Sequence, residues 1–300
     1  MTTAPRVTFG VKTMPQRTTY AEIARVWQET DASPAFTHAW AFDHFIPLGD
    51  DPTGPCLEGW TLLAALAALT HRVRVGLMVT GNTYRHPAIL ANMAATVDHI
   101  SGGRLDFGIG AGWNEREHTA YGIPLYAPGE RIARLGEACE VIRRLLAEEE
   151  ASFYGQYYQL KAARCDPKPV QRPTPPFVIG GGGERRTLRV VAQYANIWNY
   201  GGGSVDEFIH KSAVLDEHCR AIGRDPQEIE RSVQVRIGPT GGGLDGVLSA
   251  DNLAPAREQL GGFIQAGATH LVLYLVPPFA PDIVGRLAAE VAEPLLTGQA

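Results

Sequence analysis

The sequence of 300 residues contains only four cysteines, Cys56, Cys139, Cys165 and Cys219, and they lie far apart without a CxxC pair. It also has no HExxH segment and no other paired-ligand spacing among its nine histidines. Four dispersed cysteines fit reduced thiols better than a disulfide framework or a zinc site, so we expect free thiols and no bound metal. The GxSxG segment that carries a nucleophilic serine in many hydrolases is absent as well.

Positive charge is not in excess, because 27 Lys and Arg residues stand against 32 Asp and Glu residues, a net charge of −5. This balance disfavours nucleic acid or an anionic membrane surface as a partner. The longest apolar run, residues 60–69, is half the length of about 20 residues that a membrane span needs. Residues 1–10 hold no apolar signal-peptide core. We therefore expect a cytoplasmic protein without a membrane or nucleic-acid partner.

Glycine is abundant, at 33 of 300 residues, and much of it lies in short clusters that follow apolar, strand-like runs. Many α/β proteins bind phosphate groups at such positions, because a strand, a glycine loop and a helix N-terminus present free backbone N–H groups. The glycine clusters therefore direct attention to the ends of the predicted strands.

Short β-branched runs alternate with amphipathic helical segments along the chain, a pattern typical of a parallel sheet. The predicted strands cover residues 7–11, 38–43, 73–80, 104–109, 177–179, 196–199, 232–237 and 269–276. The predicted helices cover residues 20–29, 57–70, 87–100, 131–149, 184–193, 206–222, 254–266 and 281–295. Eight strands are the number that closes a parallel barrel, so the pattern predicts one α/β domain over residues 1–300, a (β/α)8 TIM-like barrel.

An open, doubly wound sheet is the competing fold. It usually carries its glycine-rich loop after the first strand, where this chain has residues 12–16 without a glycine. Residues 152–176 interrupt the barrel pattern: the aromatic residues around Gly155 predict an inserted hairpin, and the prolines that follow predict an extended return. We expect insertions at the C-terminal mouth, with residues 152–176 and 241–250 shaping a substrate pocket.

The active site of a parallel barrel lies at the C-terminal ends of its strands. Asp43 and His44 end the second predicted strand. Histidine can exchange protons near neutral pH, and aspartate can accept a hydrogen bond from a ligand. The competing interpretation is that both are ordinary loop residues. Gly76 inside the third strand indicates a bulge, a close approach of a ligand, or a packing requirement.

The fourth strand ends in a glycine-rich run that only superficially matches a dinucleotide-binding fingerprint, because Trp113 stands where the third glycine belongs. We interpret it as a glycine-lined strand exit with Trp113 and Asn114 as walls of a site. Residues 115–118 follow. They could supply an acid, but we expect them to form an exposed helical face with solvated charges. The fifth strand runs into Gly180, Gly181, Gly182 and Gly183 and then a helix, which predicts a phosphate site.

Five segments together resemble the bacterial luciferase-like family, and within it the actinobacterial oxidoreductases that use coenzyme F420, a deazaflavin. They are the Asp43-His44 strand end, residues 76–87, the turn 101–104, residues 108–113 and the loop 180–183. The resemblance covers nearly the whole chain. It implies a (β/α) barrel with a flavin or deazaflavin across its C-terminal mouth, and family members often form homodimers.

The resemblance also implies roles for single residues. His44 would be the catalytic proton donor or acceptor, and Asp43 would form a hydrogen bond with the cofactor ring. A non-prolyl cis peptide bond would join Leu77 to Met78. Some deazaflavin dehydrogenases carry a glutamate that acts as an acid near the position of Trp113, where this chain has no carboxylate. The residues expected to bind the cofactor are Asp43, Gly76, Leu77, Met78, Thr80, Gly110, Ala111, Gly112, Trp113, Asn114, Gly181, Gly182 and Gly183.

The resulting hypothesis is an oxidoreductase that transfers a hydride between F420 and an unidentified small-molecule substrate. An FMN-dependent monooxygenase of the same fold is the nearest alternative. A sugar-phosphate isomerase or lyase is more remote, because barrel phosphate sites commonly follow the seventh and eighth strands. A barrel that binds a ligand without catalysis is the remaining alternative, since a fold does not establish a reaction.

Overall fold

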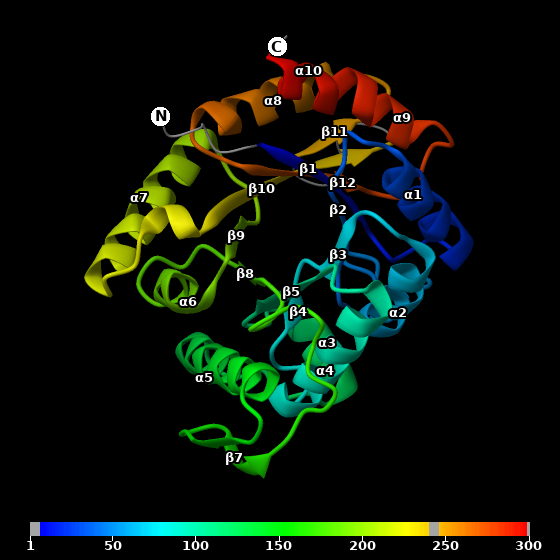
Figure 1. The fold of residues 1–300 in the computed structure, drawn as a ribbon. Coiled ribbons are helices and arrows are strands. Elements are labelled where there is room, and N and C mark those ends of the chain that lie inside the picture. The colour runs from blue at the N-terminus through cyan, green and yellow to red at the C-terminus, as the bar shows by residue number, and fades with distance from the viewer. Residues whose placement is uncertain (1–6, 240–245, 299–300) are drawn as a thin grey trace.

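Eight parallel strands form a closed barrel in the computed structural model, which describes residues 7–239 and 246–298 (Figure 1). Each strand pairs with the next in chain order, and the last pairs with the first. The strands are β1 (Thr8–Thr13), β2 (His38–Ala41), β3 (Arg74–Leu77), β5 (Leu105–Gly110), β8 (Phe177–Gly180), β9 (Ile197–Tyr200), β10 (Glu230–Gly238) and β12 (His270–Leu275). The predicted barrel is therefore confirmed.

Helices surround the barrel, as the βα alternation requires (Figure 1). They are α1 (Tyr20–Ala32), α2 (Gly59–Leu69), α3 (Pro87–Ser101), α4 (Glu115–Tyr121), α5 (Pro128–Ala147), α6 (Thr187–Tyr194), α7 (Val205–Ala221), η1 (Pro226–Glu228), α8 (Ala254–Gln265), α9 (Ile283–Leu287), η2 (Ala288–Ala292) and α10 (Glu293–Thr297). Local sequence sets their ends: Thr19 and Glu22 form a capping box before α1, and Gly102 ends α3 with φ of 66°.

Three details differ from the predicted elements. The helix predicted over residues 281–295 is divided into α9, the π-helical turn η2 and α10, where Pro294 has no N–H to continue an α-helical pattern. Two short strands were not predicted: β4 (Thr80–Gly81) pairs with β5, and β11 (Val247–Ser249) pairs with β10. They are two or three residues long, too short to give a recognisable period.

The predicted hairpin insertion is present as β6 (Ala151–Tyr154) and β7 (Gln159–Ala163). It lies outside α5, away from the barrel strands (Figure 1). Glu137 on α5 fixes its turn, because the carboxylate accepts the backbone N–H groups of Gln156 at 2.7 Å, Tyr157 at 2.8 Å and Tyr158 at 3.1 Å. The hairpin is thus part of the outer layer of the barrel.

The barrel interior is filled with side chains. Trp40, Met78, Val178, Ile197 and Val272 form an inner cluster, and a larger apolar core packs the strands against the helices. All four cysteines are free, as expected. None of the helices in the described ranges is long and apolar enough to cross a membrane.

Candidate active site

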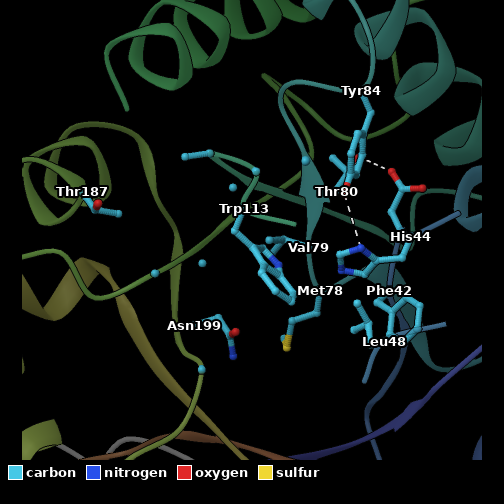
Figure 2. A pocket seen from close by; sticks show the side chains of 18 of the residues that line it. Phe42, His44, Leu48, Met78, Val79, Thr80, Tyr84, Trp113, Thr187 and Asn199 are labelled. Carbon is cyan, nitrogen blue, oxygen red and sulfur yellow. Dashed lines mark hydrogen bonds between the residues drawn. The ribbon is translucent and has the colours of Figure 1, made fainter. Parts of the chain in front are cut away.

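A cavity of about 420 Å³ opens at the C-terminal ends of the barrel strands (Figure 2). Barrel enzymes place their active sites at this face. Nine of the residues predicted from the sequence to form the site line the cavity. They are Asp43, His44, Met78, Thr80, Gly110, Ala111, Gly112, Trp113 and Gly181.

The imidazole of His44 is held in place by Glu117. Nδ1 of His44 lies 2.9 Å from Oε2 of Glu117, and both side chains are more than nine-tenths buried. The carboxylate accepts, so Nδ1 carries the proton and the lone pair of the neutral ring lies on Nε2. Nε2 is on the side of the ring that faces Trp113 and Met78 in Figure 2, and no hydrogen bond to it is found among the described residues. His44 can therefore accept a proton at Nε2.

Other donors complete the Glu117 site. The hydroxyl of Tyr84 donates to Oε2, and the backbone N–H groups of Phe45 and Ile46 donate to Oε1. Burial acts to raise the pKa of Glu117, but the hydrogen bonds from His44, Phe45 and Tyr84 outweigh it and hold the pKa below its usual value. Burial and this same carboxylate raise the pKa of Tyr84, so its hydroxyl remains a donor. Glu117 is thus an anion that orients His44 and can stabilise its protonated form.

Asp43, directly before His44, is fully buried and already has partners for both carboxylate oxygens. Arg85 donates to Oδ2 at 2.5 Å and to Oδ1 at 3.2 Å, and the Thr80 hydroxyl donates to Oδ2. Arg85 also pairs with Glu58, at the N-terminus of α2. The resemblance assigns Asp43 to the cofactor ring, and the structure places it in the cavity wall within this ion-pair network.

The glycine loop after β8 forms a different wall of the cavity. Gly180 and Gly181 line it, together with Thr187 at the start of α6 and Arg131 of α5. No side chain caps the N-terminus of α6. Backbone N–H groups at an uncapped helix start, a hydroxyl and a guanidinium are a donor set suited to a phosphate.

Five of the residues predicted to bind the cofactor do not line the cavity. Gly76 provides room for Trp40 inside the barrel, because a Cβ at Gly76 would lie 2.5 Å from the indole ring. Leu77 packs into the core against the helices, and Asn114 caps α4 by accepting from the N–H of Glu117 at 3.3 Å. Gly182 and Gly183 follow the lining residues, where the carbonyl of Gly183 accepts from the N–H of Leu188 at 3.0 Å.

The predicted position of the cis peptide bond is wrong by one residue. The bond joins Met78 to Val79 rather than Leu77 to Met78. Met78 is the first residue after β3, so the cis bond follows the end of this strand directly.

Two further expectations are corrected. Glu117 and His118 of α4 are buried, not solvated, because the helix turns them toward His44 and toward Thr83, whose hydroxyl lies 2.7 Å from Nε2 of His118. No residue of the 152–176 segment lines the cavity, since Glu137 holds its hairpin on the outer face. Residues 241–245 of the other expected pocket segment fall outside the described ranges.

Sequence reasoning missed Glu117, although it noted that residues 115–118 could supply an acid. The spacing of Asn114 and Glu117, a helix cap followed three residues later by a glutamate, marks a helix start but gives no sign of burial. It also missed Lys12, Arg236, Tyr274 and Asn199, which line the cavity from β1, β10, β12 and β9.

Comparisons with known proteins find similar sequences and similar folds. A family model described as luciferase-like monooxygenase matches residues 6–239. An uncharacterized protein of Mycobacterium tuberculosis is 31% identical over 249 residues, which cover 82% of this chain and 80% of that protein. An F420-dependent glucose-6-phosphate dehydrogenase of Kineococcus radiotolerans is 32% identical over 212 residues, 66% of this chain and 58% of the dehydrogenase.

Other similar proteins include an enzyme with a different cofactor and a solved structure. An FMNH(2)-dependent dimethylsulfone monooxygenase of Pseudomonas putida is 30% identical over 195 residues, 60% of this chain and 53% of that protein. Among solved structures, an F420-dependent secondary alcohol dehydrogenase superimposes with a TM-score of 0.83 at 18% identity, covering 97% of this chain and 99% of the other. At that identity the structural match supports the fold alone.

Proposed function

The chain belongs to the luciferase-like monooxygenase family, and we propose that it transfers a hydride between the deazaflavin F420 and a small organic substrate at the barrel mouth. The observation that carries the proposal is the His44–Glu117 pair, which leaves Nε2 of His44 open to the cavity. Such a pair can move the proton that accompanies hydride transfer to or from a carbonyl or alcohol carbon. Similarity to F420-dependent dehydrogenases favours the deazaflavin over FMN.

The residues of the cavity fit a flat, phosphate-bearing cofactor. Gly110 and Gly180 present bare backbone beside Val79. A Cβ at Gly110 would lie 2.9 Å from the Val79 side chain, and a Cβ at Gly180 would lie 3.1 Å from it. Thr187, Arg131 and the uncapped start of α6 would hold the phosphate. When bound, F420 supplies or accepts the hydride.

The side chains of the protein perform the proton transfer and control access of water. With its proton fixed on Nδ1 by Glu117, neutral His44 accepts a proton from a substrate hydroxyl at Nε2. In the opposite direction, protonated His44 donates from Nε2, and Glu117 stabilises its charge. Phe42, Leu48 and Trp113 line the cavity around His44 and reduce the access of water (Figure 2).

An anaerobic fluorescence titration of the purified protein with oxidised F420 and, separately, with FMN tests the proposal. We expect saturable quenching at micromolar concentrations with F420 and no saturable quenching with FMN. Binding of neither cofactor would contradict the proposed function. A preference for FMN would contradict the assignment of the deazaflavin.

An FMN-dependent monooxygenase is the second candidate, supported by the similarity to the dimethylsulfone monooxygenase. Reduced flavin activates oxygen, whereas deazaflavin reacts poorly with it, so the two candidates differ in oxygen uptake. Substrate turnover that requires reduced FMN and consumes oxygen would support the monooxygenase. Turnover with F420 at equal rates in air and under nitrogen would support the hydride-transfer enzyme. Membership in this oxidoreductase family replaces the sugar-phosphate isomerase hypothesis.

A further inference from the structure

Two cationic side chains, Lys12 and Arg236, form part of the cavity wall away from the glycine loop. Lys12 on β1 and Arg236 on β10 are both in register with Tyr274 of the intervening strand β12. Nζ of Lys12 lies 4.1 Å from the centroid of the Tyr274 ring, and the guanidinium carbon of Arg236 lies 5.9 Å from it. The two cations therefore flank one aromatic ring.

Their wall lies across the barrel from the predicted phosphate site. In the order of the closed sheet, β1 is the first strand and β8, which leads into Gly180 and Gly181, is the fifth of the eight in the described ranges. Opposite strands of an eight-stranded barrel face each other across its axis. A phosphate held beside Thr187 and a group held beside Lys12 would thus occupy different ends of the cavity.

Within the described part of the chain, neither cation forms an ion pair with a carboxylate. Lys12 is only 4% exposed, and its Nζ donates to Oε1 of Gln234 at 3.2 Å. Gln234 is held for this by its own bond to the carbonyl of Gly201, at 2.9 Å. Three other largely buried arginines each pair with an aspartate: Arg74 with Asp106, Arg85 with Asp43 and Arg231 with Asp216.

Placing two like charges in a poorly hydrated wall without a counter-charge is unfavourable. Burial, and then the charge of Arg236, lower the pKa of Lys12 to about 7. An anion in the cavity beside these two side chains would supply the missing counter-charge and accept their hydrogen bonds. Two cationic donors on one wall of the cavity, on either side of one aromatic ring and without a carboxylate partner, suit the binding of an oxyanion.

We propose that Lys12 and Arg236 bind an oxyanion of the substrate, a carboxylate or a phosphate, at the wall opposite the cofactor's phosphate. The inference rests on the proposed function, since it names the substrate class of the same cavity. His44 follows β2, the strand next to β1. A substrate whose anionic group binds Lys12 therefore lies near the wall of the cavity that carries the proton-transferring imidazole.

Calorimetric titration of the F420-saturated protein tests this inference with inorganic phosphate, benzoate and the uncharged benzamide. The variants are Lys12→Met and Arg236→Gln, and the matched control is Lys161→Met, which removes an exposed lysine of β7. We expect the wild type to bind at least one of the two anions more tightly than benzamide. Each cavity variant should weaken that binding about tenfold or more, because a hydrogen bond to a charged group is lost. The control should match the wild type, and equal thermal unfolding midpoints would show that the variants are folded.

The two anions distinguish the sources of the charge: phosphate binding alone indicates a phosphorylated substrate, and benzoate binding alone a carboxylate. The inference would be overturned if the wild type bound neither anion, or if both cavity variants bound the anion as tightly as the wild type. It would also be overturned if phosphate did not bind and benzoate bound no more tightly than benzamide. If both variants lost F420 binding, Lys12 and Arg236 would be cofactor-binding residues, and the inference would again be overturned. If the wild type bound no F420, the proposed function would fail, and the same anion titrations on the cofactor-free protein would still decide the role of Lys12 and Arg236.

Discussion

Glu117, from the short helix after β5, accepts a hydrogen bond at 2.9 Å from Nδ1 of His44, which lies 73 positions earlier in the loop that follows β2. Neither residue alone defines a proton-transfer site. The barrel brings them together because the C-terminal ends of all its strands open onto one face. The fixed Nδ1 proton leaves Nε2 as the reactive nitrogen, and four of the predictions below follow from this pair and from the cavity around it.

Replacing His44 removes the proposed proton donor or acceptor. We expect His44→Ala to lower turnover with F420 about 10²–10⁴-fold, because this is the usual contribution of general acid–base catalysis. Cofactor affinity should remain close to that of the wild type, and His71→Ala, at an exposed histidine, should leave turnover unchanged. Steady-state kinetics and a fluorescence titration measure both quantities. Unchanged turnover in His44→Ala would remove this residue from the mechanism.

Replacing Glu117, which orients His44, should lower the turnover number without a matching loss of cofactor affinity. Glu117→Gln retains the shape of the side chain and loses the charge that stabilises protonated His44. We expect kcat to fall about 10-fold or more, the effect of losing one charge-assisted hydrogen bond, with little change in cofactor affinity. A loss of affinity equal to the loss of kcat would indicate a structural role instead.

Glu117 should also make stability depend on pH at the acidic end. Its pKa in the folded protein lies below the ordinary value of 4.5, so its ionised form stabilises the fold above that pH. This stabilisation is lost as the pH falls through the lowered pKa. We expect the unfolding midpoint of the wild type to exceed that of Glu117→Gln at pH 6 and the difference to shrink below pH 4.5. A difference that stays constant from pH 6 to pH 3 would contradict the assignment.

The phosphate wall can be tested at Thr187, whose hydroxyl lines the cavity and has no hydrogen-bond partner among the described residues. Thr187→Val keeps the size of the side chain and removes the donor. We expect cofactor affinity to fall about fivefold, the net effect of one neutral hydrogen bond. Thr61→Val, at an exposed threonine of α2, is the control. Equal affinities of the two variants would place the phosphate elsewhere.

The sequence pattern predicted the barrel because a parallel sheet covered on both faces requires runs of buried β-branched residues at a regular spacing, and eight such runs are visible. It also predicted many of the residues that line the cavity, since strand ends can be located without knowing the fold in detail. His44, Asp43 and Gly181 were found this way. Glu117 and Lys12 were not, because a charged side chain in a sequence gives no sign of whether it is buried. Glu117 becomes buried only when α4 packs over the end of β2, and Lys12 only when β10 and β12 enclose it.

The buried ion pair between Asp43 and Arg85 should support the fold of the cavity wall rather than the chemistry. Arg85→Met leaves the fully buried carboxylate of Asp43 without its cation, and breaking one partner of a buried pair costs about 3–5 kcal/mol. Asp43→Asn combined with Arg85→Met removes both charges and should recover part of that loss. Chemical denaturation of the wild type, the two single variants and the double variant measures the coupling between them. Additive losses would show that the two side chains stabilise the protein independently, and the short contact between them would then carry no net interaction.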